Sequence, residues 1–318
     1  MLPILNNKTY SKLLIIPDGS LYHIPFEALY DGSEYMIEKS TISYANSATL
    51  LQQLKTKGGN NNKLLAFAPT FSDNNSLKLL PLPHNIIEVN NIISHFDGTI
   101  YKNNLATLKA FKNESAKYGV LHLATHAVIN DEQPEESFLA FSETNNEETL
   151  LFNNDIYNLN IAASMVCLSA CESGIGLLKK GEGMLSLSRA FFYAGASSIV
   201  NTKWKINDNS TAQIMKGFYN YLYDGKAKDK ALQLAKLDFM NKNKQNNLRH
   251  PYYWSGVVVS GNVDSINNHS NLIWLWIVAG VFILGFLYFF LRRKKLVKLS
   301  QQNFSFFFLI FVFFNNNI

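Results

Sequence analysis

One stretch of this sequence, MVCLSACES at residues 165–173, holds both of its cysteines, Cys167 and Cys171. If residues 164–169 form a strand, the rise over four residues separates the two thiols by about 13 Å, which is too far for a disulfide. Each thiol is therefore either a small buried side chain or a reactive group. Cys167 lies inside the apolar run and suits the first role. Cys171 ends the run and suits the second.

A histidine occupies the same kind of position in another apolar run, GVLHLATHAV, in which the strand candidate ends at His126. If the two runs are neighbouring parallel strands, their carboxyl ends bring the imidazole of His126 and the thiol of Cys171 to one edge of a sheet. Such a pair can perform nucleophilic catalysis, because the thiolate attacks a carbonyl and the imidazole handles the proton for the leaving group. The backbone N–H groups of Cys171 and Ala127 are candidates for stabilising the oxyanion.

Two histidines four residues apart, His122 and His126, would be a zinc signature on a helix. Their context, VLHLATH, is typical of a strand instead, and the sequence offers no obvious third ligand. We therefore predict no metal site.

Short apolar runs alternate with amphipathic stretches from Ser11 to Asn262, which predicts an α/β domain with a mostly parallel sheet. The strand candidates are KLLIIP, KLLAFAP, GVLHLATH, SMVCLSAC and ASSIVN. Helical spacing predicts helices over residues 86–96, 185–193, 207–222 and 227–240. The first of these helices has an apolar face formed by Ile86, Ile87, Val89, Ile92, Ile93 and Phe96. Asn207 or Asp208 is the expected N-cap of the third.

Several stretches, taken in order, resemble the CHAT domain, a branch of the caspase-like cysteine peptidases that includes the separases and gingipains. They run from Leu13 to Gly261, and they are LLIIPDGSLYHIPFEAL, ISYANSATLL, LHLATHA, LSACESGIG, GEGMLSLSRAFFYAGASSIVNTKWKIND, FYNYL and HPYYWSGVVVSG. The resemblance implies a caspase-like three-layer α/β sandwich with a mostly parallel central sheet. It also implies that His126 and Cys171 form a catalytic dyad that cleaves peptide bonds without a metal or an organic cofactor.

Two positions depart from the wider clan. Ala127 follows the histidine where caspase-like enzymes often have glycine, and its Cβ restricts the backbone at this point. Ser169 stands two residues before the cysteine, where metacaspases carry an aspartate that binds a basic substrate side chain. A neutral hydroxyl cannot form that ion pair, so Glu172 and Asp208 join Ser169 as candidates for lining a substrate pocket. Asp208 has a second interpretation, as the cap of the helix that begins there.

The formal net charge of +5 comes from one cluster, Arg292, Arg293, Lys294, Lys295 and Lys298. Residues 1–291 carry 24 basic and 24 acidic side chains. A neutral main body does not suit a nucleic-acid partner, so none is predicted.

Residues 272–291, LIWLWIVAGVFILGFLYFFL, are uncharged and almost wholly apolar. As a helix they would measure about 30 Å, the thickness of a bilayer core, which predicts a single transmembrane helix in contact with membrane lipid. The alternative, a buried core helix, is less favoured because the segment has no polar face. The basic cluster that follows predicts a cytoplasmic tail and an extracytoplasmic main domain by the positive-inside rule.

These features predict a CHAT domain at residues 1–262, a linker at 263–271, the membrane helix at 272–291, and a basic stop with a low-complexity tail at 292–318. The predicted function is that of a membrane-anchored cysteine endopeptidase acting on protein or peptide substrates. The alternative is a catalytically silent caspase-like scaffold for interaction or signalling. Because CHAT domains commonly follow tetratricopeptide repeats, and no export signal opens the chain, we also expect a repeat region in a longer parent protein.

Overall fold

The computed structural model describes residues 10–57, 61–72, 75, 77–94, 96–130, 132–143, 148–169, 171–172, 182–266, 278, 280–286 and 288–289, with the backbone alone at 171–172 and 182–186. The strands in these residues are β1 (Lys12–Ile15), β2 (Thr41–Tyr44), β3 (Leu64–Ala68), β4 (Gly98–Lys102), β5 (Val120–Leu123), β6 (His126–Val128), β7 (Phe138–Ala140), β8 (Leu150–Phe152), β9 (Met165–Leu168), β10 (Cys171–Glu172), β11 (Ser198–Thr202) and β12 (Val257–Gly261).

The α-helices are α1 (Met36–Lys39), α2 (Ala48–Thr56), α3 (Asn85–Ile93), α4 (Leu108–Glu114), α5 (Asn153–Tyr157), α6 (Glu182–Ala194), α7 (Asp208–Tyr223) and α8 (Lys228–Lys242). Short 3-10 turns join them: η2 (Gly19–His23), η3 (Phe26–Ala28), η4 (Asn103–Leu105), η5 (Ser115–Lys117), η6 (Pro134–Glu136), η7 (Asn247–Arg249) and η8 (Pro251–Tyr253).

The central sheet has eight strands in the order β1-β2-β12-β11-β9-β5-β3-β4. Neighbouring strands are parallel at every described pairing except β11 with β12. The carboxyl ends of β4, β3, β5, β9 and β11 therefore lie at one edge of the sheet, together with the amino end of β12. The prediction of a mixed α/β fold with a mostly parallel central sheet is confirmed.

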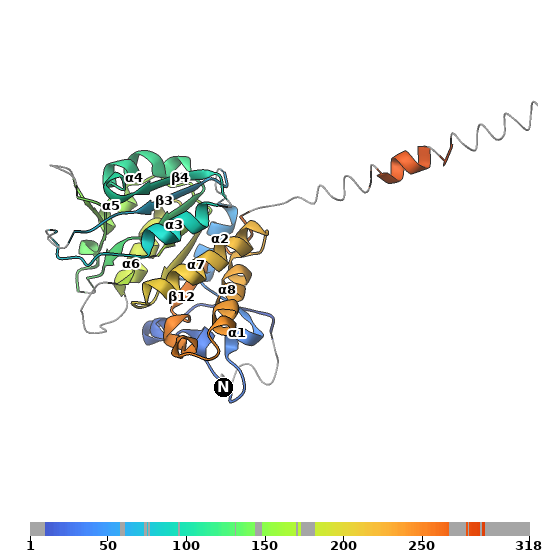
Figure 1. Cartoon of the computed structure of the whole chain (residues 1–318), viewed down its shortest axis with the longest axis horizontal. Coiled ribbons are helices and arrows are strands. Elements are labelled where there is room, and N and C mark those ends of the chain that lie inside the picture. The colour runs from blue at the N-terminus through green and yellow to red at the C-terminus, as the bar shows by residue number, and fades with distance from the viewer. Residues whose placement is uncertain are drawn as a thin grey trace, which may run out of the picture. The chain divides into compact units, whose positions relative to one another are not determined.

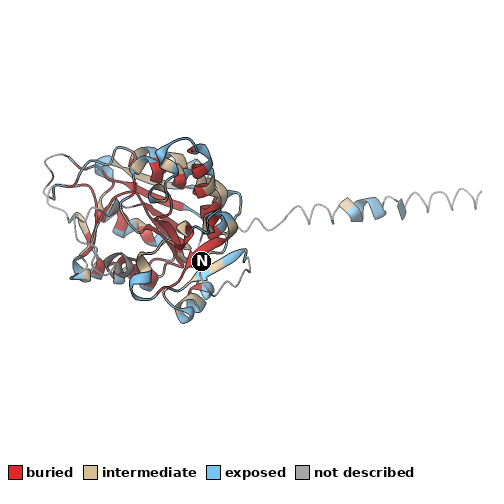
Figure 2. Cartoon of the chain, turned by 90° about the horizontal axis from the view of Figure 1, so that it is seen from below, coloured by how far each residue is buried: buried red, intermediate tan, exposed pale blue. Residues whose placement is uncertain are grey.

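Helices cover both faces of this sheet, and residues of one strand alternate between the two layers (Figure 1). In β3, Leu64 and Ala66 join the core beneath α3, α7 and α8, whereas Leu65 and Phe67 join the core shared with α4, α5 and α6. The period of two in a strand produces this division, and burial on both faces explains why the central strands read as continuous apolar runs. The sheet forms the buried middle of the domain (Figure 2).

A smaller sheet, in the order β10-β6-β7-β8, continues from the same edge. The chain leaves β5 at Leu123 and enters β6 at His126, and it leaves β9 at Leu168 and enters β10 at Cys171. Leu123 lies opposite Leu168 in the central sheet, and His126 lies opposite Cys171 in the small one, so both parallel pairings keep one register.

The structure identifies the N-cap of α7, which the sequence leaves open between Asn207 and Asp208. The side chain of Asn207 accepts hydrogen bonds from the N–H groups of Asn209 and Ser210, at 3.1 and 3.3 Å. Asn207 is therefore the N-cap, and Asp208 is the first residue of the helix.

The edge formed by β1 and β2 has a small core of its own. Phe26, Ile42, Tyr44 and Val258 are buried there, apart from the two main cores. A buried ion pair of 3.4 Å between Lys236 of α8 and Glu27 of η3 ties this part of the domain to the rest.

The predicted membrane helix is corrected by the structure. Among the residues that the structure describes, no helix is long and apolar enough to cross a bilayer. The single-pass membrane location and its orientation are therefore wrong by this finding. Apart from 278, 280–286 and 288–289, residues 272–291 and all of 292–318 lie outside the described residues.

The turn between α6 and β11 depends on a glycine. Gly195 follows the last residue of α6 with a φ of +116°, and a Cβ there would clash with the carbonyl of Ile161. We expect Gly195→Ala to lower the free energy of unfolding by about 2–4 kcal/mol, since backbone strain and overpacking add.

Gly19→Ala is the matched control for urea unfolding. Gly19 also has a positive φ, +52°, but a Cβ there would meet nothing within 4 Å. It should therefore cost only the conformational penalty of about 1–2 kcal/mol. Equal losses in the two variants would contradict the proposed clash.

Candidate active site

The two residues predicted at the ends of central-sheet strands lie instead in the short strands that follow, β6 and β10. His126 and Cys171 lie opposite each other in β6 and β10, and Ala127 lies opposite Glu172. The prediction that each residue ends a main strand is wrong in detail, because β5 ends at Leu123 and β9 at Leu168. The shift has a local cause: the hydroxyl of Thr125 donates to the carbonyl of Ala140 in β7 and draws the chain into the small sheet.

His126 is held in a defined orientation. Its side chain is buried, its Nε2 lies 2.7 Å from the backbone carbonyl of Leu80, and its ring packs edge-on against Phe71 with centroids 4.8 Å apart. A carbonyl only accepts hydrogen bonds, so the neutral imidazole carries its proton on Nε2. Its Nδ1 is then a bare acceptor, and it has no hydrogen-bond partner among the described residues. The neutral ring can therefore accept a proton at Nδ1.

Burial lowers the pKa of His126 below its usual value. The hydrogen bond to Leu80 and the negative charge of Asp208 oppose this effect, while the positive charge of Lys205 adds to it. Because desolvation disfavours the charged imidazolium, the ring is neutral at pH 7 and able to accept a proton.

Cys167 behaves as the sequence predicts. It is a free thiol with no exposed surface, and its Sγ lies 3.7 Å from the sulfur of Met215. Burial raises the pKa of this thiol well above its usual value. A thiol that does not ionise is a poor nucleophile, so Cys167 is a core residue.

A small cavity adjoins Thr125, the residue directly before His126. It is lined by Leu82, His84, Asn85, Glu88, Thr125, Ser169, Asp208 and Thr211, and its volume of about 20 Å³ holds about one water molecule. The predicted pocket residues Ser169 and Asp208 thus come together in one lining. The backbone of Glu172, the third predicted pocket residue, lies in β10 opposite Ala127, and its side chain lies outside the described atoms.

Sequence reasoning missed Glu88, a buried carboxylate on α3 in the wall of this cavity. The signal was present, because Asn85 and Glu88 lie two turns and one turn before Ile92 on the same buried stripe. Ile87, which was expected on the apolar face, is 52% exposed. A carboxylate on a buried stripe requires a partner.

One partner of the Glu88 carboxylate is His122 of β5. Oε1 of Glu88 lies 2.9 Å from Nε2 of His122, and Nδ1 of His122 lies 3.0 Å from the hydroxyl of Tyr219 in α7. Both His122 and Tyr219 are fully buried. The distance between Glu88 and His122 permits an ion pair, but the angle is not that of a hydrogen bond, so neither atom has a hydrogen-bond partner among the described residues.

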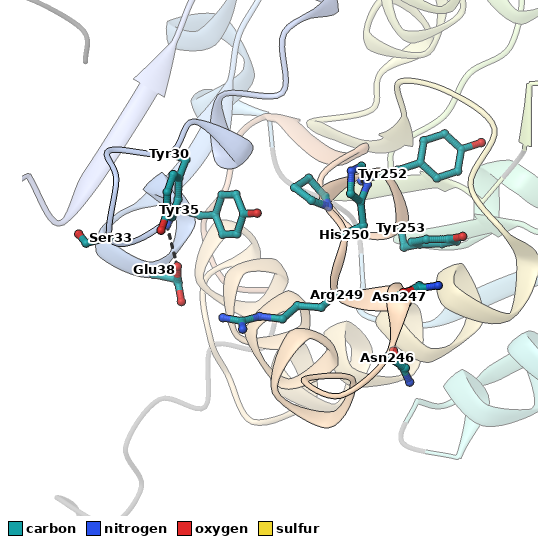
Figure 3. A pocket seen from close by; sticks show the side chains of 11 residues that line it. Tyr30, Ser33, Tyr35, Glu38, Asn246, Asn247, Arg249, His250, Tyr252 and Tyr253 are labelled. Carbon is teal, nitrogen blue, oxygen red and sulfur yellow. Dashed lines mark hydrogen bonds between the residues drawn. The ribbon is translucent and has the colours of Figure 1, made fainter.

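A second, larger pocket of about 700 Å³ lies elsewhere and shares no lining residue with the first. Tyr30 and Tyr35 line one side and Tyr252 and Tyr253 another, with Arg249 reaching between them (Figure 3). Its wall supports the segment after β11: the hydroxyl of Tyr252 donates to the carbonyl of Lys205 at 2.7 Å, and the Tyr252 ring stacks on Trp204.

Among the described residues, no group of three or more His, Cys, Asp or Glu side chains is arranged to hold a metal ion.

A sequence model of the CHAT domain matches residues 1–262, so the chain belongs to the CHAT domain family. It is 27% identical over 126 residues to tetratricopeptide repeat protein 28 of Mus musculus, and 26% identical over 127 residues to the same protein of Homo sapiens. Each alignment covers 40% of this chain and 5% of the relative, so the chain spans about one twentieth of the length of these relatives.

Three solved structures match parts of this chain at low identity. The complex of the pro- and mature domains of RgpB from Porphyromonas gingivalis matches at 10% identity and a TM-score of 0.46, covering 71% of this chain and 56% of the other. The separase–securin complex of Saccharomyces cerevisiae matches at 12% and 0.47, covering 76% and 15%. Caspase-1 from Spodoptera frugiperda matches at 13% and 0.37, covering 64% and 86%.

The lowered pKa of His126 predicts a pH dependence of stability. As the pH falls through the ordinary histidine range near 6.5, the unfolded state binds a proton that folded His126 resists. The unfolded state then binds more protons, so this residue makes the free energy of unfolding fall toward acid pH. We expect His126→Gln to reduce that fall, measured by urea unfolding at pH 7.5 and 5.5. Identical losses in the variant and the wild type would contradict the lowered pKa.

Proposed function

We propose that this chain is a CHAT-family cysteine endopeptidase in which His126 and Cys171 act as base and nucleophile on protein or peptide substrates. The observation that carries the proposal is the parallel register of β6 with β10, which sets the two residues opposite each other, together with the bare Nδ1 of His126. Membership of the CHAT domain family supports it as well.

In the proposed mechanism, Nδ1 of His126 takes the proton of the Cys171 thiol, and the thiolate attacks the carbonyl carbon of the scissile peptide bond. As the C–N bond breaks, the imidazolium returns its proton to the leaving amine, and the acyl group stays on sulfur as a thioester. His126 then takes a proton from water, and the resulting hydroxide equivalent hydrolyses the thioester and regenerates the thiol.

Each supporting feature has a role in these steps. The carbonyl of Leu80 fixes the proton on Nε2 and leaves Nδ1 to act, and the Phe71 ring limits rotation of the imidazole. The backbone N–H groups of Ala127 and Cys171 belong to adjoining strands and are the proposed donors to the oxyanion.

A second candidate function is a catalytically silent scaffold that binds protein partners. The specific observation in its favour is the relationship to tetratricopeptide repeat protein 28, whose name describes a repeat protein rather than a peptidase. A repeat region in a longer parent of this chain would fit either function, as a site for substrate or for partner.

We expect Cys171→Ala and His126→Ala each to reduce cleavage by at least about 10³-fold, since both residues of such a pair act as one unit. The full chain is incubated with a mixed peptide library, and the products are identified by mass spectrometry. Cys167→Ala is the matched control: it removes the only other thiol and should keep the activity of a folded protein.

Labelling with a peptidyl acyloxymethyl ketone complements this assay. An adduct on Cys171 that is lost in His126→Ala supports the peptidase. Full turnover in either dyad variant would overturn it, and folded wild-type protein that neither cleaves nor is labelled at Cys171 would leave the scaffold as the better account.

A further inference from the structure

We propose that the small cavity beside Thr125 binds the ammonium group of a lysine side chain, with Glu88 as its charge partner. The inference rests on the proposed function in one respect: the lysine belongs to the substrate, on the amino-terminal side of the bond that is cleaved.

The cavity is lined mainly by acceptors. Two acidic residues, Glu88 and Asp208, line it together with Thr125, Ser169 and Thr211, whose hydroxyl oxygens can accept hydrogen bonds. The amide of Asn85 also lies in the lining, but its N–H group is already used, donating to the carbonyls of Pro69 and Ala124 at 2.8 and 3.3 Å. An ammonium group has three donors and no acceptor, so it is the complement of this lining.

One of these acceptors is buried and has no partner among the described residues. The side chain of Ser169 is 8% exposed, and its Oγ makes no hydrogen bond there. Glu88 is 4% exposed, and its Oε1 is the oxygen that lies 2.9 Å from Nε2 of His122, so the ammonium group would use its other oxygen. Buried polar atoms in folded proteins are nearly always satisfied, so the Ser169 hydroxyl and the second oxygen of Glu88 suit a donor that enters the cavity.

The size of the cavity decides between the two basic side chains. About 20 Å³ accommodates one group the size of a water molecule. The ammonium of lysine is a compact point charge, whereas the guanidinium of arginine is a planar fork that needs both oxygens of a carboxylate. Because one oxygen of Glu88 faces His122, a bidentate contact is not offered. Lysine is therefore favoured over arginine.

The position of the cavity relates it to the proposed chemistry. Thr125 directly precedes His126, and Ser169 stands two residues before Cys171. The proposal therefore assigns a side chain seated there to the residue whose carbonyl is attacked. Glu88 also supplies the charge that Ser169 lacks, from a helix far away in the sequence.

Glu88 rather than Asp208 should dominate the selectivity. Glu88 is almost fully buried, whereas Asp208 is only half-buried at the start of α7. A charge interaction is stronger where water is excluded. Asp208 thus provides a matched control, a second carboxylate in the same lining but in a more polar environment.

The test measures binding in the absence of turnover, using the full chain with Cys171→Ala. The peptide acetyl-Ala-Ala-Ala-Lys-Ala-Ala-amide is titrated by calorimetry, together with versions that carry norleucine or arginine in place of lysine. Norleucine has the same unbranched carbon stem as lysine without the charge. We expect the lysine peptide to bind about tenfold more tightly than the norleucine peptide, and more tightly than the arginine peptide.

Adding Glu88→Gln should abolish the difference between lysine and norleucine, while adding Asp208→Asn should leave most of it. If Glu88→Gln does not fold, Glu88→Gln with His122→Gln replaces it, since replacing both members of a buried pair is better tolerated than replacing one. Equal binding of lysine and norleucine would overturn the proposal and leave the cavity as a water site. Equal effects of Glu88→Gln and Asp208→Asn would also overturn the role of Glu88.

The proposal for the cavity and the proposal for the peptidase can be rejected separately. Wild-type protein that cleaves peptides without regard to lysine would keep the proposed function and reject the cavity. Lysine binding by the Cys171→Ala chain, together with no cleavage by the wild type, would keep the cavity and reject the peptidase.

Discussion

The parallel pairing of β5 with β9 is the constraint on which the rest of the site depends. Its register, with Val120 opposite Met165 and Leu123 opposite Leu168, is fixed by side chains that are buried on both faces of the sheet. A slip of one residue would exchange the two faces of the strand and bury the wrong set, so the register is strongly specified. Because β6 and β10 continue these two strands in the same register, the opposition of His126 and Cys171 follows from hydrophobic packing several residues away. The fold of the sheet itself therefore places these two residues opposite each other.

The same alternation explains why a polar network lies beneath this edge. His122 occupies the position of β5 that faces α3 and α7, and there it meets Glu88 and Tyr219. Removing such groups from water costs several kcal/mol each unless they are paired. Here His122 lies between the two other side chains, 2.9 Å from Glu88 and 3.0 Å from Tyr219, and these contacts offset part of that cost.

Much of this arrangement could be predicted from the sequence, and the failures have physical causes. The runs around residues 64–68, 120–123, 165–168 and 198–202 were recognisable as strands because burial on both faces leaves them continuously apolar. The break between β5 and β6 was not recognisable, since it depends on a hydrogen bond from Thr125 to a strand that comes later in the chain. The orientation of His126 could not be predicted either, because its partner is the backbone carbonyl of Leu80, and a residue of any type would supply the same carbonyl. Glu88 was hidden by its apolar neighbours. The apolar stretch near the C-terminus shows the opposite error, in which composition alone predicted a membrane helix that the described residues do not contain.

The antiparallel pairing of β11 with β12 separates β1, β2 and β12 from the other five strands of the central sheet. The two parts differ in how many residue pairs join their neighbouring strands. One parallel pair, Ser260 with Tyr44, is found between β12 and β2, while β5 has four with β3 and four with β9. The edge that includes β1 and β2 also rests on a small core of its own. Amide protons on this edge would exchange with solvent through a local opening that leaves the central strands intact. The domain would therefore lose its edge at a lower free energy than the strands that hold His126 opposite Cys171, and a partner that bound or displaced that edge could act on the molecule without unfolding its centre.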